Sequence, residues 1–417
     1  MKQLIALAAA LGLSVPACAE TVAITGAKAW TMTEAAPVDD ATILLRDGHV
    51  LSVTAGGAIP PGVRTISAGG RVVTPALVDA ATQIGLGEVG AIAEERSASV
   101  DKGPLGASFD VEYAIDPNSQ AVRQARADGV ARALIYPNAS ASAPFAGIGA
   151  VLHLVRGEGV LERPRAAMFA RVGGGEAAAV GGSRAAGWQL LRNALDEAKA
   201  FRRSQSGRSP RDQILNHLDA EALQPVIAGT MPLVVQTDRL SDIRQAIALA
   251  RDYGLRLILF GGAEAWAAAD ALAAAHIPVV LDPLAALPDS YDTIGARRDN
   301  ASLLAKAGVP IAFSVSGQGI YRSWNAGPSM REGAGLAVAA GLPYGAALAA
   351  ITSAPACLLG LDGRVGTLAP GAEADLVIWD GDPLEPATAP ALVMIGGREI
   401  SPVTRQTLLR DRYRPVR

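Results

Sequence analysis

The clearest strand pattern in the chain lies between residues 71 and 85, which read RVVTPALVDAATQIG. Two apolar pairs, Val72-Val73 and Leu77-Val78, flank Pro75 in this stretch. Short apolar runs on either side of a proline are typical of two strands with a break between them. The pattern therefore predicts a strand, an interruption at Pro75 and a second strand.

The segments at the two ends of the chain share a second pattern. Residues 21–74 contain short β-branched runs separated by turns such as Asp47-Gly48 and Gly69-Gly70, and the chain beyond residue 363 returns to runs of this kind. Neither segment could bury its apolar face alone. We therefore predict one small discontinuous β-sandwich, formed by residues 20–74 together with residues 363–417.

Between these segments, strand-like runs alternate with helical ones. PLVVQTD, which ends at Asp238, is followed by an amphipathic helical pattern that stops at Gly254, and further pairs follow it. Such alternation over roughly 250 residues predicts an α/β fold with a (β/α)8 TIM-like barrel over residues 75–362. A doubly wound open sheet is the rival fold, but the chain lacks a glycine-rich dinucleotide turn after its first strand.

Composition narrows the classes of function. Half of the 417 residues are hydrophobic, 18% are charged and the net charge is −3. A nucleic-acid-binding face of basic and aromatic residues is not expected from this sequence. After residue 20 no charge-free apolar run reaches the ~20 residues that a membrane span needs.

The first residues resemble a signal peptide. Lys2 is followed by an apolar stretch over residues 4–15 and by the small-x-small site Ala17-Cys18-Ala19. We predict a signal peptide over residues 1–19 and export to a bacterial periplasm. A lipoprotein anchored at Cys18 is the alternative, which Pro16 disfavours, and a buried N-terminal helix is another. Cys357, in the apolar pattern PACLLGL, is expected in the core.

Several of these motifs resemble the amidohydrolase superfamily. The frame from Pro75 to Asp79 is similar to the start of that family's first barrel strand, Pro-Gly-x-x-Asp-x-His-x-His, and residues 363–384 are similar to its C-terminal signature. Other segments resemble exported amidohydrolases close to imidazolonepropionase. The resemblance covers nearly the whole chain after the signal peptide. It implies a barrel with a composite sandwich and hydrolysis of carbon–nitrogen bonds at a divalent metal such as zinc.

The resemblance also locates the family's metal ligands on this sequence. The two histidines of the first strand fall at Ala81 and Gln83, those of the fifth and sixth strands at Gln236 and Gly261, and the aspartate of the eighth strand at about Ser316. None of these residue types is a good zinc ligand. We therefore expect no metal cofactor at this place.

Four histidines occur in the chain, and they are His49, His153, His217 and His276. His153 is the one on a predicted barrel strand, near where relatives have a lysine. It is either a core histidine bonded to a neighbouring residue or part of a functional site. His49 is expected at the surface of a hairpin, His217 in an exposed linker and His276 at a helix end.

Two acidic residues follow the fifth and sixth strands. Asp238 and Glu264 could form a carboxylate pair facing the barrel mouth. Alternatively, Asp238 caps the helix after it and Glu264 pairs with an arginine such as Arg239. The candidate pocket residues are Gln83, His153, Gln236, Asp238, Glu264 and Ser316.

Two functions follow from this sequence. The first is a degenerate amidohydrolase, a pseudoenzyme that acts as a periplasmic binding or scaffold protein for a polar small molecule or peptide. The second is a hydrolase of non-peptide carbon–nitrogen bonds or dipeptides, with a relocated or metal-free site. The loss of ligands at every expected position favours the first.

Overall fold

The two apolar runs around Pro75 belong to two different sheets. The computed structural model describes residues 21–88, 97–155, 157, 159–175, 177–201, 214–315 and 324–414. In it, Val72–Pro75 forms a strand in one sheet and Leu77–Thr82 forms a strand in the other. The break predicted at the proline is thus the place where the chain passes from one sheet to the other. The predicted signal peptide lies outside the described residues.

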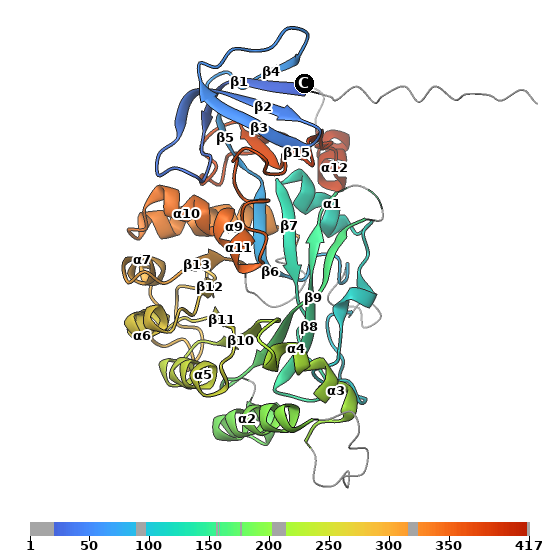
Figure 1. The fold of residues 1–417 in the computed structure, drawn as a ribbon, viewed down its shortest axis with the longest axis vertical. Coiled ribbons are helices and arrows are strands. Elements are labelled where there is room, and N and C mark those ends of the chain that lie inside the picture. The colour runs from blue at the N-terminus through green and yellow to red at the C-terminus, as the bar shows by residue number, and fades with distance from the viewer. Residues whose placement is uncertain are drawn as a thin grey trace, which may run out of the picture.

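The first sheet combines both ends of the chain. Its strand order is β16-β15-β14-β5-β1-β2-β3, with β4 paired to β1. The C-terminal strands join through β14, which runs antiparallel to β5 and pairs Leu376 with Pro75. Figure 1 shows this sheet at one end of the molecule, with blue N-terminal strands beside the red β15. The strands are β1 (Thr21–Ala29), β2 (Val38–Arg46), β3 (His49–Ala55), β4 (Arg64–Ser67), β5 (Val72–Pro75), β14 (Leu376–Trp379), β15 (Pro390–Ile395) and β16 (Arg398–Glu399).

One apolar cluster holds this composite sheet together. Ile24 and Ile43 from the N-terminal strands pack with Leu376 and Ile378 from β14, and all four are buried. The Trp379 side chain is completely buried, and its Nε1 donates to Thr74 Oγ1 at 2.9 Å. The predicted joining of the two terminal segments is therefore confirmed, whereas the exact domain boundaries stay a prediction.

The second sheet is the near-closed barrel. Its strand order is β13-β12-β11-β10-β9-β8-β7-β6, and the Ser314 hydroxyl, just after β13, donates a hydrogen bond to the Ala81 carbonyl on β6. This bond links the first and last strands. The strands are β6 (Leu77–Thr82), β7 (Val130–Ile135), β8 (Phe145–His153), β9 (Leu161–Arg171), β10 (Leu233–Thr237), β11 (Leu257–Gly261), β12 (Val279–Leu281) and β13 (Ile311–Phe313).

One strand departs from the expected parallel order. β8 runs antiparallel to both β7 and β9, while the other neighbouring pairs of the barrel are parallel. The segments 136–144 and 154–160 that connect these three strands are short, and a parallel pair needs a crossover of about a dozen residues or more. The barrel is confirmed, but the prediction of eight parallel strands is wrong at β8.

Helices cover the outside of the barrel and bury one face against it. On α5 the buried residues include Ile243, Ala246 and Leu249, and the helix ends at Gly254 with a φ of 66°. This confirms Gly254 as the predicted stop. The helices are α1 (Gln120–Ala127), α2 (Arg184–Ala200), α3 (His217–Ala222), α4 (Gln224–Ile227), α5 (Leu240–Tyr253), α6 (Ala269–Ala274), α7 (Asn300–Lys306), α9 (Ala326–Ala339), α10 (Tyr344–Ala350), α11 (Ser353–Leu358) and α12 (Arg405–Tyr413), with short 3-10 turns η2 (Val111–Ala114), η3 (Ala177–Val180) and η5 (Ala265–Ala268).

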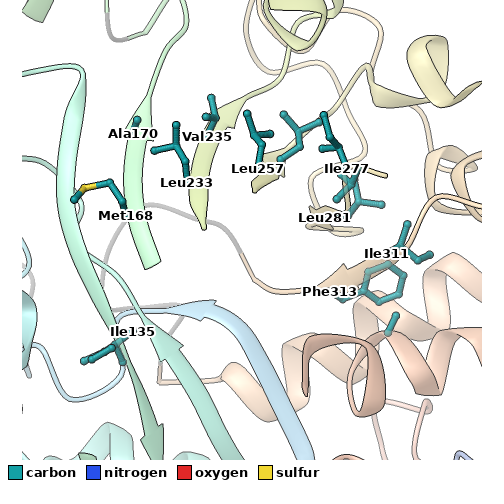
Figure 2. Packing of buried hydrophobic residues seen from close by; sticks show 14 of the residues in the cluster. Ile135, Met168, Ala170, Leu233, Val235, Leu257, Ile277, Leu281, Ile311 and Phe313 are labelled. Carbon is teal, nitrogen blue, oxygen red and sulfur yellow. The ribbon is translucent and has the colours of Figure 1, made fainter. Parts of the chain in front are cut away.

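Alternate residues of the barrel strands serve two apolar layers. Leu233 and Leu257 belong to the layer beneath the helices, of which Figure 2 shows members from β9 to β13. Val234 and Ile258, their neighbours in sequence, belong to a second cluster inside the barrel. Successive strand residues point to opposite faces, so one strand supplies both layers. Among the described residues, no helix combines the length and apolarity needed to cross a bilayer.

Two local predictions are wrong. Cys357, expected in the core, is exposed on α11 because it lies on the side of that helix turned away from the buried Pro355 and Ala356. His217, expected in a linker, is the first residue of α3, where Asn216 caps the helix by accepting a hydrogen bond from the Asp219 N–H at 2.9 Å. His217 itself is exposed, as expected.

Truncation after Gly360 tests the composite sheet. The shortened chain loses β14, which uncovers Val73 and Ile24 and leaves the edge of β5 unpaired. We expect the truncated protein to be insoluble, measured as the soluble fraction after lysis. A truncated chain that stays monomeric and melts cooperatively near the temperature of the full chain would contradict this pairing.

Candidate functional site

A cavity of about 750 Å³ lies at the mouth of the barrel. Arg171 and Gly261 end β9 and β11, and Gln236 is the last residue but one of β10. All three line this cavity together with Tyr136 and Asp282. The carboxyl ends of parallel barrel strands meet at one end, which is where barrel proteins build their sites. This cavity is therefore the main candidate site.

Aromatic side chains lie at the inner part of this cavity. The Tyr136 ring stacks on Phe169 with 5.1 Å between ring centroids and meets the edge of Phe260 at 5.4 Å. Burial raises the pKa of Tyr136 to about 12. Its phenol is therefore protonated at neutral pH and can donate or accept one hydrogen bond.

Acidic and basic groups both line the mouth. Burial raises the pKa of Asp238 to about 6, and its Oδ1 accepts a hydrogen bond from the Ala263 N–H at 3.1 Å. Arg171 Nη1 donates to the Asn138 carbonyl at 2.9 Å, which fixes a positive charge in the same cavity. The lining can therefore meet both acceptors and donors on a ligand.

Asp79 lies fully buried near the seam of the barrel. Burial raises its pKa from the usual 3.8 to about 7, against the opposing effect of hydrogen bonds from the Ala81 N–H, Ser314 and Thr82. The nearby Asp282 raises the pKa further. A carboxyl that titrates near neutrality at the closing seam makes the barrel sensitive to pH.

The predicted site residues separate into three groups. Gln236 and Asp238 line the cavity at the mouth, and Gln83 follows β6 at the same end of the barrel. Ser316 lies outside the described residues. His153 lies at the opposite end, because β8 runs antiparallel and its last residue pairs with Arg132, in the first half of β7.

The helix cap expected from Asp238 and the arginine pair expected for Glu264 are both replaced by bonds to backbone N–H groups. Glu264 accepts hydrogen bonds from the Leu240 N–H at 2.8 Å and the Gly295 N–H at 2.9 Å, so it caps α5 from the neighbouring loop. Asp238 does not cap α5, whose N-cap residue Arg239 makes no side-chain cap bond. Asp238, which follows β10, thus accepts an N–H from the loop after β11, and Glu264, which follows β11, accepts an N–H from the segment after β10.

Gly261 has a conformation that excludes most side chains. Its φ is +94°, and a Cβ atom built on it would lie 2.7 Å from Asp238 Oδ1. L-residues rarely adopt such a φ. A histidine at this position would require movement of both the backbone and Asp238.

A second polar cluster lies at the closed end of the barrel. The Arg132 side chain is completely buried; it pairs with Glu162 at 2.8 Å, with Glu373 at 2.5 Å and with Asp375. His153 Nε2 lies 3.9 Å from Asp375 Oδ2, and burial, with help from the Arg132 charge, lowers the pKa of His153. The imidazole is therefore neutral at pH 7.

This cluster contains three groups that could hold a metal ion by distance. Ligand atoms of His153, Glu373 and Asp375 lie within 4.8 Å of one another, and in the described part of the chain they form the one such group of three. Arg132 already donates to both carboxylates, so an ion here would have to displace a buried guanidinium. We interpret the cluster as a structural ion-pair network.

Sequence reasoning missed four residues of the mouth and its surroundings, which are Asp79, Tyr136, Arg171 and Asp282. A signal existed for Asp79, which belongs to the Pro75–Asp79 frame, and for Arg171 and Asp282, which follow apolar strand runs directly. Residues just after a barrel strand face the mouth, and this position in the sequence is the signal that marks them.

Comparisons with known proteins agree with this architecture. A model of the amidohydrolase family matches residues 226–400. The amidohydrolase tasK of Hapsidospora irregularis is 53% identical over 57 residues, which span 14% of this chain and 6% of that protein. The structure of an amidohydrolase from Thermotoga maritima MSB8 is similar with a TM-score of 0.80 and 23% identity, covering 91% of this chain and 99% of that one. An adenosine deaminase from Xanthomonas campestris with bound zinc has a TM-score of 0.54 and 18% identity, covering 95% and 99%.

The raised pKa of Asp79 predicts a stability that depends on pH. The folded state holds a proton on Asp79 up to about pH 7, whereas the unfolded chain releases it near pH 3.8. The contribution of Asp79 to the free energy of unfolding is therefore fully present below pH 3.8, and it is lost as the pH rises through 7. We expect Asp79→Asn to flatten this dependence and to raise the free energy of unfolding at pH 8 by up to about 4 kcal/mol.

Chemical denaturation at pH 5 and pH 8 measures this effect. Asp116→Asn is the matched control, since Asp116 is exposed. If the free energy of unfolding of Asp79→Asn changes with pH as steeply as that of the parent protein, Asp79 is not the group that causes the pH dependence.

Proposed function

We propose that this chain is a member of the amidohydrolase superfamily that binds a polar small molecule or peptide at its barrel mouth without the family's metal-dependent hydrolysis. The proposal makes it a binding or scaffold protein. With the signal peptide expected over residues 1–19, its proposed location is the periplasm.

The positions of the histidines carry this proposal. None of the four lies among the described residues that line the mouth. His49 begins β3, His153 lies at the closed end, His217 begins α3 and His276 follows α6. Catalytic zinc needs three protein ligands, usually including histidine. Within the described residues, the mouth also lacks three acids or histidines close enough to share an ion.

The local backbone supports the same conclusion. Ala81, at the place of a family histidine, is 2% exposed and packs in the apolar cluster inside the barrel. Gly261, at another such place, would bring a Cβ within 2.7 Å of Asp238. Two of the places where the family has histidines are therefore occupied by residues with little or no side chain.

The lining suits a polar ligand. Gln236 and Asn138 offer amides, Asp238 and Asp282 offer carboxylates, and Arg171 offers a guanidinium. A cavity of about 750 Å³ has the size of a small-molecule site. The aromatic ring of Tyr136 adds an apolar surface beside these groups. A zwitterionic or amide-bearing compound would find partners for each of its polar groups.

One observation favours the alternative function, hydrolysis of a carbon–nitrogen bond or dipeptide without a metal. Asp79, with a pKa of about 7, is hydrogen bonded to Ser314, and a base beside a hydroxyl is the arrangement that nucleophilic catalysis uses. Both side chains are only 1% exposed, however, and neither is among the described residues lining the mouth. A substrate could not reach them without opening the seam.

Hydrolysis assays test the proposal directly. We expect no turnover of acyl-amide or dipeptide substrates by the unmutated protein, with or without added zinc or manganese. The variant Ala81→His/Gln83→His should also be inactive, because two imidazoles leave zinc short of a catalytic set. Turnover that a chelator abolishes would overturn the proposal, and turnover that resists chelation would favour the metal-free hydrolase.

Calorimetric titration with a panel of dipeptides tests the binding half of the proposal. Gln236→Ala should weaken the binding of a captured dipeptide about three- to tenfold, because one or two hydrogen bonds are lost. The matched control Gln406→Ala, exposed on α12, should leave the affinity unchanged. Equal affinities of the parent protein and Gln236→Ala for the dipeptide would contradict binding at the mouth.

A further inference from the structure

A second cleft, of about 800 Å³, lies on the outer wall of the barrel. Leu105, Phe201 and Leu218 supply apolar walls, and Asp110 and Arg165 supply a charged pair. Leu218 belongs to α3 and Phe201 is the C-cap residue of α2, so helices of the outer layer form one side. The size is that of a small-molecule site, and none of the mouth residues described above lines it.

A bulge in β9 delivers the positive charge to this cleft. Gly149 pairs with Ala167 and Val151 with Arg163, so two steps along β8 correspond to four along β9. Pro164 lies in the extra length and offers no N–H to the ladder. Arg165, which follows it, has a φ of +49°, in the left-handed region that arginine rarely adopts. Bulges of this kind redirect a side chain.

The charged pair presents its positive member to the cleft. The Asp110 side chain is 4% exposed, and its oxygens accept from the Glu112 N–H at 3.1 Å and from Arg165 Nη1 at 3.1 Å. The Arg165 side chain is 43% exposed, and a guanidinium has five N–H donors. A molecule entering the cleft therefore meets the cation more readily than the acid.

Hydrogen bonds fix one wall of the cleft. Asp219 on α3 accepts from the Ser108 N–H at 2.8 Å and from the Ser108 hydroxyl at 2.6 Å. It also accepts from the Gly106 N–H at 3.1 Å. These bonds fix the loop that carries Leu105 against α3. A preformed cleft lowers the entropic cost of binding.

We propose that this cleft is a second binding site, which takes an organic anion with a compact apolar or aromatic body. The body packs between Leu105, Phe201 and Leu218, and its single carboxylate or sulfonate pairs with Arg165. Glu221 on α3 also lines the cleft and disfavours a second negative group. The site is independent of the barrel mouth, where Arg171 of the same strand lies.

Two fluorescent probes test this site on the full chain. The anion 8-anilinonaphthalene-1-sulfonate has an aromatic body and one sulfonate, and N-phenyl-1-naphthylamine has a similar body without the charge. We expect saturable binding of the anion, weakened about tenfold by Arg165→Gln and largely restored by Arg165→Lys. Glu221→Gln should strengthen it. The neutral probe should be insensitive to all three changes.

Further variants guard against misfolding and unspecific binding. Leu218→Glu changes a side chain that is 41% exposed, so folding is preserved while the anion is repelled. Arg251→Gln, on the exposed side of α5, should leave binding unchanged. Thermal melting checks that each variant folds. Equal binding of the anion by the parent protein, Arg165→Gln and Leu218→Glu would overturn the proposal, and so would equal sensitivity of both probes to Arg165→Gln.

Discussion

The buried guanidinium of Arg132 is the interaction on which the two sheets depend. It lies on β7 of the barrel and pairs with Glu162 on β9 and with Glu373 and Asp375, just before β14 of the composite sheet. Removal of a buried ion's partner typically costs about 3–5 kcal/mol, because the remaining charge is left unpaired. Asp375 also accepts from the Gly396 N–H at 2.6 Å, and its carbonyl accepts from the Ala76 N–H at 2.9 Å, where the chain passes between the sheets. The network therefore holds the closed end of the barrel, the crossing point and the returning C-terminal strands in one arrangement.

This arrangement separates stability from binding along the barrel. At the closed end the three carboxylates are paired with arginines, because Arg132 contacts all three and Arg364 contacts Glu162 and Glu373. At the mouth, burial raises the pKa of Asp238 to about 6, and its carboxylate accepts a hydrogen bond from the Ala263 N–H. Groups with strongly shifted pKa values in a cavity are characteristic of functional sites, although structural networks shift them too. The cluster of His153, Glu373 and Asp375, whose spacing would suit a metal ion, therefore lies at the closed end of the barrel and not at the mouth.

Patterns local in the sequence predicted much of the fold. Pro75 between two apolar pairs marked the change of sheet, and Asp-Gly and Gly-Gly turns marked the segments that form the composite sheet. Features set by distant partners were missed. The Arg132 network joins strands far apart in the sequence, and Glu264 and Asp238 each accept a backbone N–H of a neighbouring loop. The antiparallel direction of β8 was also missed, because its two short connections, 136–144 and 154–160, resembled parts of a βα repeat. At the mouth, the sequence predicted Gln236 and Asp238, but it could not show that Gly261 has a positive φ beside Asp238.

The central claim is that the barrel mouth of this protein works without a bound metal. Elemental analysis of the full-length protein, purified without chelator, tests it most directly. The account predicts clearly substoichiometric zinc, manganese and iron, because the mouth offers amides, a glycine and isolated carboxylates. About one or more tightly held ions per chain would contradict it, since a catalytic zinc requires a ligand set that these residues do not supply.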